Sequence, residues 1–457
     1  MPRKAAPLTP PVVCTVAGSD SGGGAGVQAD LKTIEAGGGF GTSVVTSVTA
    51  QNTTGVESTH VLPVAEVDAQ AAAVFEDFDV AAVKTGMLAT APVVELVTER
   101  VRAFGGPAVV DPVMVAASGD RLLEPEAEDA YEELVAESAL VTPNVDEAAV
   151  LTGREVTDPG SATAAGEALV DMGADAALVK GGHLEGGDVV DVLVTGDTVE
   201  TLRHSRVDTA ATHGSGCTLS SAIATRLAHG DDLPAAVRSG IELLARAVRY
   251  NLDVGEGPGA VHHTVALRDR AARQPTAERV EWVLRDFRER DVSPLVPEVG
   301  MDVAGATPYA ETEGECAAVE GRLTRTLDGV ASPRGVRFGA STRVAGALLA
   351  AREADADLRF AANCRYDNAV AAALADLDGP VVEYDRAEYA HGDRDGSDGG
   401  RAGPAATRQG VEAAVADLDG PPVAAVGTGG AKEPLVTLFA PDAGTLVDRV
   451  ATLLEAS

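Results

Sequence analysis

Cysteine is scarce in this chain of 457 residues, which has only four. Cys14, Cys217, Cys316 and Cys364 form no CxxC pair and no spacing typical of zinc ligands. This usage argues against a disulfide framework and a structural zinc site, and it indicates a reducing compartment.

Long apolar runs are also missing. No stretch reaches the roughly 18 apolar residues that a membrane-spanning helix needs. The first eleven residues lack the apolar centre of a signal peptide. We therefore expect a cytoplasmic protein without a membrane partner.

Basic residues are few, and lysine is the rarer of the two kinds. The chain has 36 basic and 70 acidic residues, for a formal net charge of −34. The lysines are Lys4, Lys32, Lys84, Lys180 and Lys432. An acidic, lysine-poor surface suits a cytoplasm of very high salt, where screening weakens self-repulsion, although a GC-rich coding bias is an alternative explanation. The charge disfavours nucleic acid as a partner.

The length predicts two or three domains. In the first half, apolar segments typical of buried strands alternate with helical patterns. These segments are Val12–Ala17, Val44–Val48, Ala81–Val83, Ala108–Val110, Leu140–Val141 and Ala176–Val179. Polar residues follow each one, which is the pattern of an α/β domain with a doubly wound, mostly parallel sheet and a site beyond the strand ends.

The stretch from His213 to Thr218 predicts a binding turn for an anion. Glycines separate its small polar residues, and the sequence after it is helical. Such a turn directs backbone N–H groups and the positive end of a helix at one point. A thiol there, Cys217, would have a lowered pKa and could act as a base. The alternative is an ordinary helix start capped by Ser215, with Cys217 as a small buried residue.

Charged residues follow several of the predicted strands. Lys84 and Lys180 stand at strand ends in a chain that has little lysine, which favours a requirement for positive charge there. Asn144 and Glu147 have the spacing of a helix cap and its reciprocal partner, and capping alone could explain them. Asp111 precedes a proline and could simply begin a turn.

A glycine-rich loop, Gly18–Gly26, connects the first strand to a helix. It is not a P-loop, because Val27-Gln28 stands where lysine and serine or threonine should follow. The dinucleotide spacing also fails. The loop therefore indicates a close approach to the backbone without identifying what approaches.

The second half predicts another domain. Asp253–Arg273 has weak periodicity and resembles a linker, and a helix is expected from about Ala277 to Arg290. Further strands and helices alternate after it, with an acidic glycine-rich loop at Gly392–Gly403. Lys432 lies in another glycine-rich segment, which is either an anion site or a plain turn.

Eight motifs in the first half together resemble one family. They are Ala17–Asp20, Gly22–Lys32, Ala50–Thr53, Lys84–Leu88, Asp111–Met114, Thr142–Asn144, Val179–His183 and Gly214–Thr218. In this order they resemble hydroxymethylpyrimidine and hydroxymethylpyrimidine-phosphate kinase, over about Val12–Asn251. The resemblance implies a ribokinase-like fold and two phosphorylations of 4-amino-5-hydroxymethyl-2-methylpyrimidine by ATP and Mg²⁺.

The resemblance also implies roles for individual residues. Gln51 would hydrogen-bond the aminopyrimidine. Its pocket would include Gly18, Asp30, Met87 and Val113. The anion hole would comprise Gly214, Ser215, Gly216 and Cys217, with Cys217 as the base. Lys180 and Asn144 would bind ATP, and Asp111 and Glu147 would bind Mg²⁺. A pyridoxal-type kinase is a further reading, against which Gln51 and Met87 argue.

The second half resembles the archaeal-type thiamine-phosphate synthase domain. The resemblance rests on Leu295–Gly300, Gly321–Leu323, Phe338–Ser341, Asn363–Asp367, Tyr384–Arg386 and Lys432–Pro434. It implies that hydroxymethylpyrimidine pyrophosphate is joined to thiazole phosphate. The family depends on an arginine, here Arg322, and on a histidine where this chain has Arg343. The alternative is therefore a non-catalytic domain that senses thiamine phosphate.

The combined prediction is a bifunctional α/β enzyme of thiamine biosynthesis. The kinase domain is expected at residues 10–254, a linker at 255–276 and the synthase-type domain, a second α/β layer, at 277–457. Its partners would be ATP, Mg²⁺ and small-molecule substrates, and we expect a homo-oligomer.

Overall fold

The computed structural model describes residues 5–457 apart from 116–122, 125–126, 183, 185, 197, 390–403, 419 and 430–432. His183, Lys432 and the predicted acidic loop at 392–403 therefore lie outside the described residues. The chain forms two compact units, Met1–Leu267 and Arg268–Ser457. Within the described part, no helix is both long enough and apolar enough to cross a membrane.

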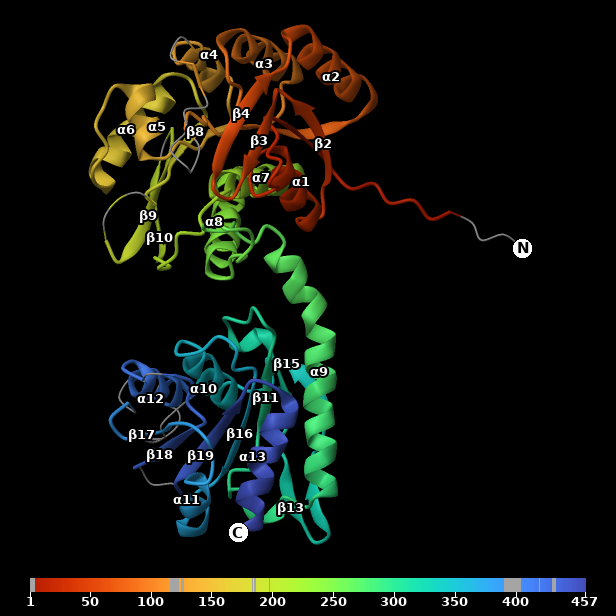
Figure 1. Cartoon of the computed structure of the whole chain (residues 1–457), viewed down its shortest axis with the longest axis vertical. Helices are drawn as coiled ribbons and strands as arrows, with labels where there is room; N and C mark the ends of the chain where they lie inside the picture. The colour runs from red at the N-terminus through yellow and green to blue at the C-terminus, as the bar shows by residue number, and fades with distance from the viewer. Residues whose placement is uncertain are drawn as a thin grey trace. The chain divides into compact units, whose positions relative to one another are not determined.

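The first unit is built around a sheet of eight strands (Figure 1). Its strands are β1 (Val12–Ala17), β2 (Phe40–Val45), β5 (Val80–Thr85), β6 (Ala108–Val110), β7 (Leu140–Val141), β8 (Ala176–Val179), β9 (Asp188–Thr195) and β10 (Val199–Ser205). Their order across the sheet is β10-β9-β8-β7-β6-β5-β1-β2. The six strands from β8 to β2 run parallel, and the β9–β10 hairpin extends the sheet antiparallel.

Helices cover both faces of this sheet, as a doubly wound sheet requires. They are α1 (Gly26–Ala36), α2 (Val64–Asp77), α3 (Ala91–Phe104), α4 (Tyr131–Ala136), α5 (Val145–Thr152), α6 (Pro159–Asp171), α7 (Ser215–Ala228) and α8 (Leu233–Arg249). On one face α1, α7 and α8 bury residues such as Ile34, Ile223 and Ile241. On the other face α2, α3 and α4 bury Val67, Val97 and Leu134. The expected α/β architecture is confirmed.

One predicted strand is wrong in its bounds. The segment expected at Val44–Val48 is divided between β2 and a second strand, β3 (Ser47–Asn52). β3 leaves the main sheet and pairs with β4 (Gly55–Val61) as a separate antiparallel hairpin. Gln51 therefore stands on this hairpin and not at the end of a central strand.

The expected linker is also partly wrong, because helix α9 (Val265–Glu289) begins twelve residues before Ala277. Pro275 lies inside it. Buried Val280, Val283, Leu284 and Phe287 of this helix pack into the core of the second unit. The burial of this apolar stripe stabilises the helix despite its proline and its weak apolar periodicity.

The second unit has a sheet of seven strands in the order β15-β12-β11-β16-β19-β18-β17. The bounds are β11 (Val303–Ala306), β12 (Cys316–Val319), β15 (Val336–Phe338), β16 (Phe360–Arg365), β17 (Val381–Asp385), β18 (Ala424–Thr428) and β19 (Leu435–Ala440). All neighbours pair antiparallel except β17 and β18. A small hairpin, β13 (Thr324–Thr326) with β14 (Gly329–Ala331), stands apart.

Helices again cover both faces of the second sheet. The remaining helices are α10 (Arg343–Ala351), α11 (Asn368–Leu374), α12 (Pro404–Val415) and α13 (Ala443–Glu455), with short 3-10 turns at Ser293–Leu295 and Glu313–Glu315. α9, α11 and α13 supply one core layer, whereas α10 and α12 supply the other. The second unit is therefore a three-layer α/β domain.

Candidate active site

A cavity of about 650 Å³ lies beyond the carboxyl ends of the parallel strands in the first unit. Twelve of the thirteen residues predicted for the kinase site line it. They are Gly18, Gln51, Met87, Asp111, Val113, Asn144, Glu147, Lys180, Gly214, Ser215, Gly216 and Cys217. Parallel strands bring their carboxyl ends to one edge, which is why residues so far apart in sequence meet here.

Asp30 is the exception, and its predicted place in the pocket wall is wrong. Its side chain is fully buried on α1, and it does not line the cavity. It accepts hydrogen bonds from Thr15 Oγ1 at 2.6 Å and Ser221 Oγ at 2.8 Å. It also forms an ion pair with Lys84 Nζ at 2.8 Å. Asp30 therefore lies behind the pocket wall, where it supports another residue.

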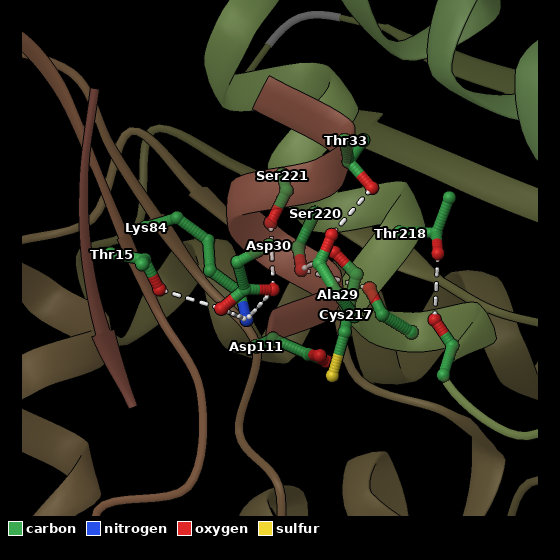
Figure 2. A network of polar contacts seen from close by, with 12 residues as sticks. Thr15, Ala29, Asp30, Thr33, Lys84, Asp111, Cys217, Thr218, Ser220 and Ser221 are labelled. Atoms are coloured by element: carbon green, nitrogen blue, oxygen red, sulfur yellow. Dashed lines mark hydrogen bonds and ion pairs between the residues drawn. The ribbon is translucent and has the colours of Figure 1, made fainter. Parts of the chain in front are cut away.

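That other residue, Lys84, is a site residue that the predicted set omits. Figure 2 shows Lys84, Thr15 and Ser221 converging on Asp30, with Cys217 beside them. Lys84 lines the cavity, although its side chain has no exposed surface. Burial alone would lower its pKa, but the Asp30 carboxylate holds the pKa of Lys84 above its usual value. The wall next to Cys217 thus contains an ammonium group that is paired with a buried carboxylate.

The turn at residues 213–218 has the predicted geometry. α7 begins at Ser215, and Gly214 is its cap with φ of 81°, a conformation that favours glycine. A Cβ at position 214 would overlap the carbonyl oxygen of Gly24, so no side chain fits there. The suggestion that Ser215 caps the helix is wrong. No side chain caps α7, and Ser215 N donates to Thr212 O at 3.1 Å, so the N–H groups of Gly216 and Cys217 are the donors that an anion at this helix start would use.

The expectation that the helix start lowers the pKa of Cys217 is wrong for this structure. Desolvation raises the pKa of the Cys217 thiol to about 11, and the nearby Lys84 offsets this only in part. The charges of Asp30 and Asp111 raise it further. At neutral pH the residue is therefore a neutral thiol in this structure.

Lys180 lies between two carboxylates beside the turn at Gly214–Cys217, because a Cβ at Gly216 would lie 3.1 Å from Asp111 Oδ2 and 3.3 Å from Lys180 Nζ. Its Nζ is 2.9 Å from Asp111 Oδ1 and 3.9 Å from Glu147 Oε2. Burial raises the pKa of Glu147 to about 7, an effect that the charge of Lys180 opposes. The three groups form a compact cluster of alternating charge at the ends of β6 and β8.

Asn144 and Glu147 also form a capping box at the start of α5. Glu147 N donates to Asn144 Oδ1 and Asn144 N donates to Glu147 Oε2, both at 2.8 Å. The alternative explanation of their spacing as a helix cap is therefore confirmed. It does not remove them from the site, because both residues line the cavity.

The predicted ring-binding side of the cavity is formed by β3 and the glycine-rich loop. Gln51 N donates to Ser21 Oγ at 2.7 Å, and Thr49 Oγ1 donates to Gln51 Oε1 at 3.3 Å. A Cβ at Gly18 would lie 2.6 Å from Ser47 Oγ, so glycine is needed there. Met87 Sδ is 3.8 Å from the same hydroxyl. The amide of Gln51 and the thioether of Met87 therefore both line this side of the cavity.

Asp20 and His213 connect the two glycine-rich turns, which the sequence did not reveal. Asp20 accepts backbone hydrogen bonds from Gly22, Gly24 and Ala25 at 2.7 to 3.0 Å. His213 Nε2 lies 3.0 Å from Asp20 Oδ2. The N–H groups of this loop are therefore occupied by Asp20, and the loop is not itself a phosphate cradle. The position of Asp20 near the start of the glycine-rich loop is the sequence feature that could have predicted this role.

In the second unit, the charges of Arg322 and Arg343 are close enough to influence each other. Desolvation lowers the pKa of the Arg343 guanidinium, and the charges of Arg322 and Arg386 lower it further. Arg322 has φ of 62°, which is unusual for a residue other than glycine and typical of functional sites. Its Nη1 donates to Val299 O at 2.6 Å. Mutual repulsion of three guanidinium groups is typical of a site that binds an anion.

Two protein families match this chain, and each match falls within one of the two units. The family model for phosphomethylpyrimidine kinase matches residues 20–262, and the model for thiamine-phosphate synthase ThiN matches residues 279–452. The hydroxymethylpyrimidine/phosphomethylpyrimidine kinase of Streptomyces coelicolor is 49% identical over 262 residues, which are 57% of this chain and 97% of that protein. The bifunctional protein ThiED of Geobacter sulfurreducens is 44% identical over 58% of this chain and 55% of its own.

Among solved structures, the ADP complex of Bacillus subtilis pyridoxal kinase is similar with a TM-score of 0.54. It is 32% identical, and the match covers 57% of this chain and 99% of that one. The match supports the ribokinase-like fold of the first unit. The chain belongs to the phosphomethylpyrimidine kinase family and carries a domain of the thiamine-phosphate synthase ThiN family behind the kinase.

Proposed function

We propose that the first unit phosphorylates hydroxymethylpyrimidine and then its monophosphate with ATP, and that the second unit joins the resulting pyrophosphate to thiazole phosphate. The observation that carries the kinase assignment is the single cavity that holds a ring-binding end and a phosphate-binding end. Gln51 and Met87 stand at the first, and the turn at Gly214–Cys217 stands at the second. Phosphoryl transfer depends mainly on such positioning and on neutralised charge.

Lys180 would contact the phosphates of ATP, and Asn144 would assist it. Lys180 is the cation of the cluster with Asp111 and Glu147, so it can exchange a carboxylate contact for a phosphate contact. The N–H groups at the start of α7 would stabilise the negative charge that develops during transfer. These donors are fixed before the substrate binds.

Asp111 and Glu147 fit a Mg²⁺ ion in the chemistry of their donor atoms. Mg²⁺ takes one or two carboxylates and completes its octahedron with phosphate oxygens and water. Among the described residues, no three His, Cys, Asp or Glu side chains are grouped so that they could hold a metal ion by themselves. When bound, the ion would neutralise charge on the phosphates.

Cys217 would receive the proton of the hydroxymethyl group in the first phosphorylation. Only the thiolate can accept a proton, and the thiol has a pKa of about 11, so this role requires Cys217 to lose its own proton first, which the charge of Lys84 favours. The second phosphorylation has a phosphate as the acceptor and needs no base. The role of Cys217 is therefore confined to the first step.

The match of residues 279–452 to the synthase family favours a synthase over a thiamine-phosphate sensor in the second unit. Arg322 and Arg343 would hold the phosphates. We further propose that the protein functions in a cytoplasm of high salt, which its net charge of −34 supports. We also propose that it forms a homo-oligomer, which sedimentation would measure.

The decisive experiment incubates the full chain with hydroxymethylpyrimidine, thiazole phosphate, ATP and Mg²⁺ in concentrated KCl. Thiamine phosphate as the product supports both assignments, whereas pyrimidine pyrophosphate alone would leave a sensor. Preferential phosphorylation of pyridoxal would overturn the assignment of hydroxymethylpyrimidine as the substrate. Lys180→Met should abolish pyrophosphate formation, and Arg102→Met, which removes an exposed cation on α3, is the matched control.

A further inference from the structure

Asp302 is a buried carboxylate beside the arginine group of the second unit, and the predicted roles do not include it. It lies directly before β11 and is only 6% exposed. Its backbone N donates to Asn363 Oδ1 at 2.6 Å, and Asn363 N donates to its carbonyl at 3.2 Å. These bonds to β16 fix the place of the residue.

Two further contacts define what surrounds the Asp302 side chain. Met301 and Leu323 exchange backbone hydrogen bonds of 2.9 and 2.7 Å, which places Arg322 alongside Asp302. Ser341, on the turn before α10, and the backbone N–H of Val303 both lower the pKa of the Asp302 carboxyl, as neighbours that can donate to it do. The Ser341 hydroxyl accepts from Val344 N at 3.2 Å, so its own hydrogen is available for the carboxylate.

One oxygen of Asp302 remains without a partner. Among the described residues, Oδ1 is buried and has no hydrogen bond, and the same holds for Arg343 Nε. A buried carboxylate oxygen without a donor is costly and rare, so a native structure that keeps one usually has a use for it. Desolvation raises the pKa of Asp302 to about 6, while Ser341 and Arg322 oppose this shift, so the group is an acceptor at neutral pH.

The chemistry of the proposed substrates determines which group can satisfy this oxygen. A carboxylate repels phosphates, which the arginines attract. The thiazole ring has no N–H group. The aminopyrimidine alone offers a neutral N–H donor, its exocyclic amino group.

We propose that Asp302 accepts a hydrogen bond from the exocyclic amino group of the pyrimidine, while Arg322 and Arg343 hold the phosphates. This inference rests on the proposed synthase function of the second unit. It makes Asp302 a specificity-determining residue, which distinguishes the pyrimidine from rings that have no amino group. It also accounts for a buried carboxylate beside the guanidinium groups.

The test measures binding to the full chain by calorimetry with thiamine phosphate, oxythiamine phosphate, which has an oxygen in place of the amino group, and thiazole phosphate. Asp302→Ala should weaken thiamine phosphate binding by roughly 10- to 100-fold, the range for a hydrogen bond to a charged group. Binding of thiazole phosphate should change less than about twofold. Asp302→Asn, which keeps an acceptor oxygen, should restore part of the loss. Asp357→Ala, at an exposed carboxylate before β16, is the control.

The wild-type chain should already discriminate against oxythiamine phosphate, and Asp302→Ala should abolish that discrimination. Asp302 is not part of the kinase cavity, so these differences report on the second unit. Equal losses for all three ligands would indicate a structural role and overturn the inference while leaving the synthase function intact. Unchanged binding would overturn it as well. If the wild-type chain binds none of the ligands and forms no thiamine phosphate, the synthase assignment itself fails.

Discussion

The buried ion pair of Asp30 and Lys84 allows a quantitative prediction. Replacing Lys84 by methionine keeps most of the side-chain volume and removes the positive charge. Asp30 would retain the hydroxyl donors of Thr15 and Ser221 but lose its counter-charge. Both side chains have no exposed surface in the folded unit.

The expected loss of stability follows from that burial. Removing one partner of a buried ion pair costs about 3–5 kcal/mol, because an uncompensated charge remains in a medium of low dielectric. The double variant Asp30→Asn/Lys84→Met removes both charges and should recover most of the loss. High salt should change these values little, because buried charges are poorly screened.

Hydrogen exchange with mass spectrometry is the appropriate measurement, because the chain has two units that can unfold separately. Peptides from α1, β5 and α7 should lose protection in Lys84→Met and regain it in the double variant. Peptides from α10 in the second unit serve as the internal reference. A loss below about 1 kcal/mol, or a double variant no more stable than the single one, would refute the reasoning.

Three further predictions concern the site and the solvent. Alkylation of Cys217 by iodoacetamide should be slow at pH 8 and should rise about tenfold per pH unit toward its pKa of about 11; a rate that is flat above pH 7 would contradict the desolvated thiol. Cys217→Ser should slow the first phosphorylation more than the second, and equal losses in a two-step assay would remove its role as base. The unfolding temperature should rise as KCl increases from roughly 0.5 to 3 M, since screening weakens the repulsion within a chain of net charge −34; calorimetry that shows no change would argue against a salt-adapted fold.

The arrangement of the first unit could largely be predicted from its sequence. Valine-rich segments such as Ala108–Val110 are buried on both faces, and a polar residue follows each of them. Because parallel strands end at one edge, the polar residues that follow them were expected at one site, and Asp111, Lys84 and Lys180 stand at three of these strand ends. The structure places all three at one cavity. The periodicity of the sequence and the topology of a parallel sheet were sufficient to predict which strand ends form the site.

Burial and local pairing could not be predicted in the same way. The pKa of Cys217 depends on how much protein surrounds the sulfur, which no local pattern reveals. The position of Asp30 behind the wall depends on Thr15 and Ser221, which are distant in the sequence. In the second unit, β11 and β12 consist mainly of alanine and glycine with a few larger residues. Such segments lack the β-branched composition by which strands are recognised.

The close packing of Gly24 against Gly214 limits how this enzyme can change. A Cβ at Gly214 would overlap the carbonyl oxygen of Gly24, whereas a Cβ at Gly24 would lie 2.5 Å from the ring of His213. Because the obstacle at Gly214 is a backbone oxygen, no substitution at position 24 removes it. New substrate preferences would have to arise around Gln51 and Met87, while the phosphate end of the cavity stays constant.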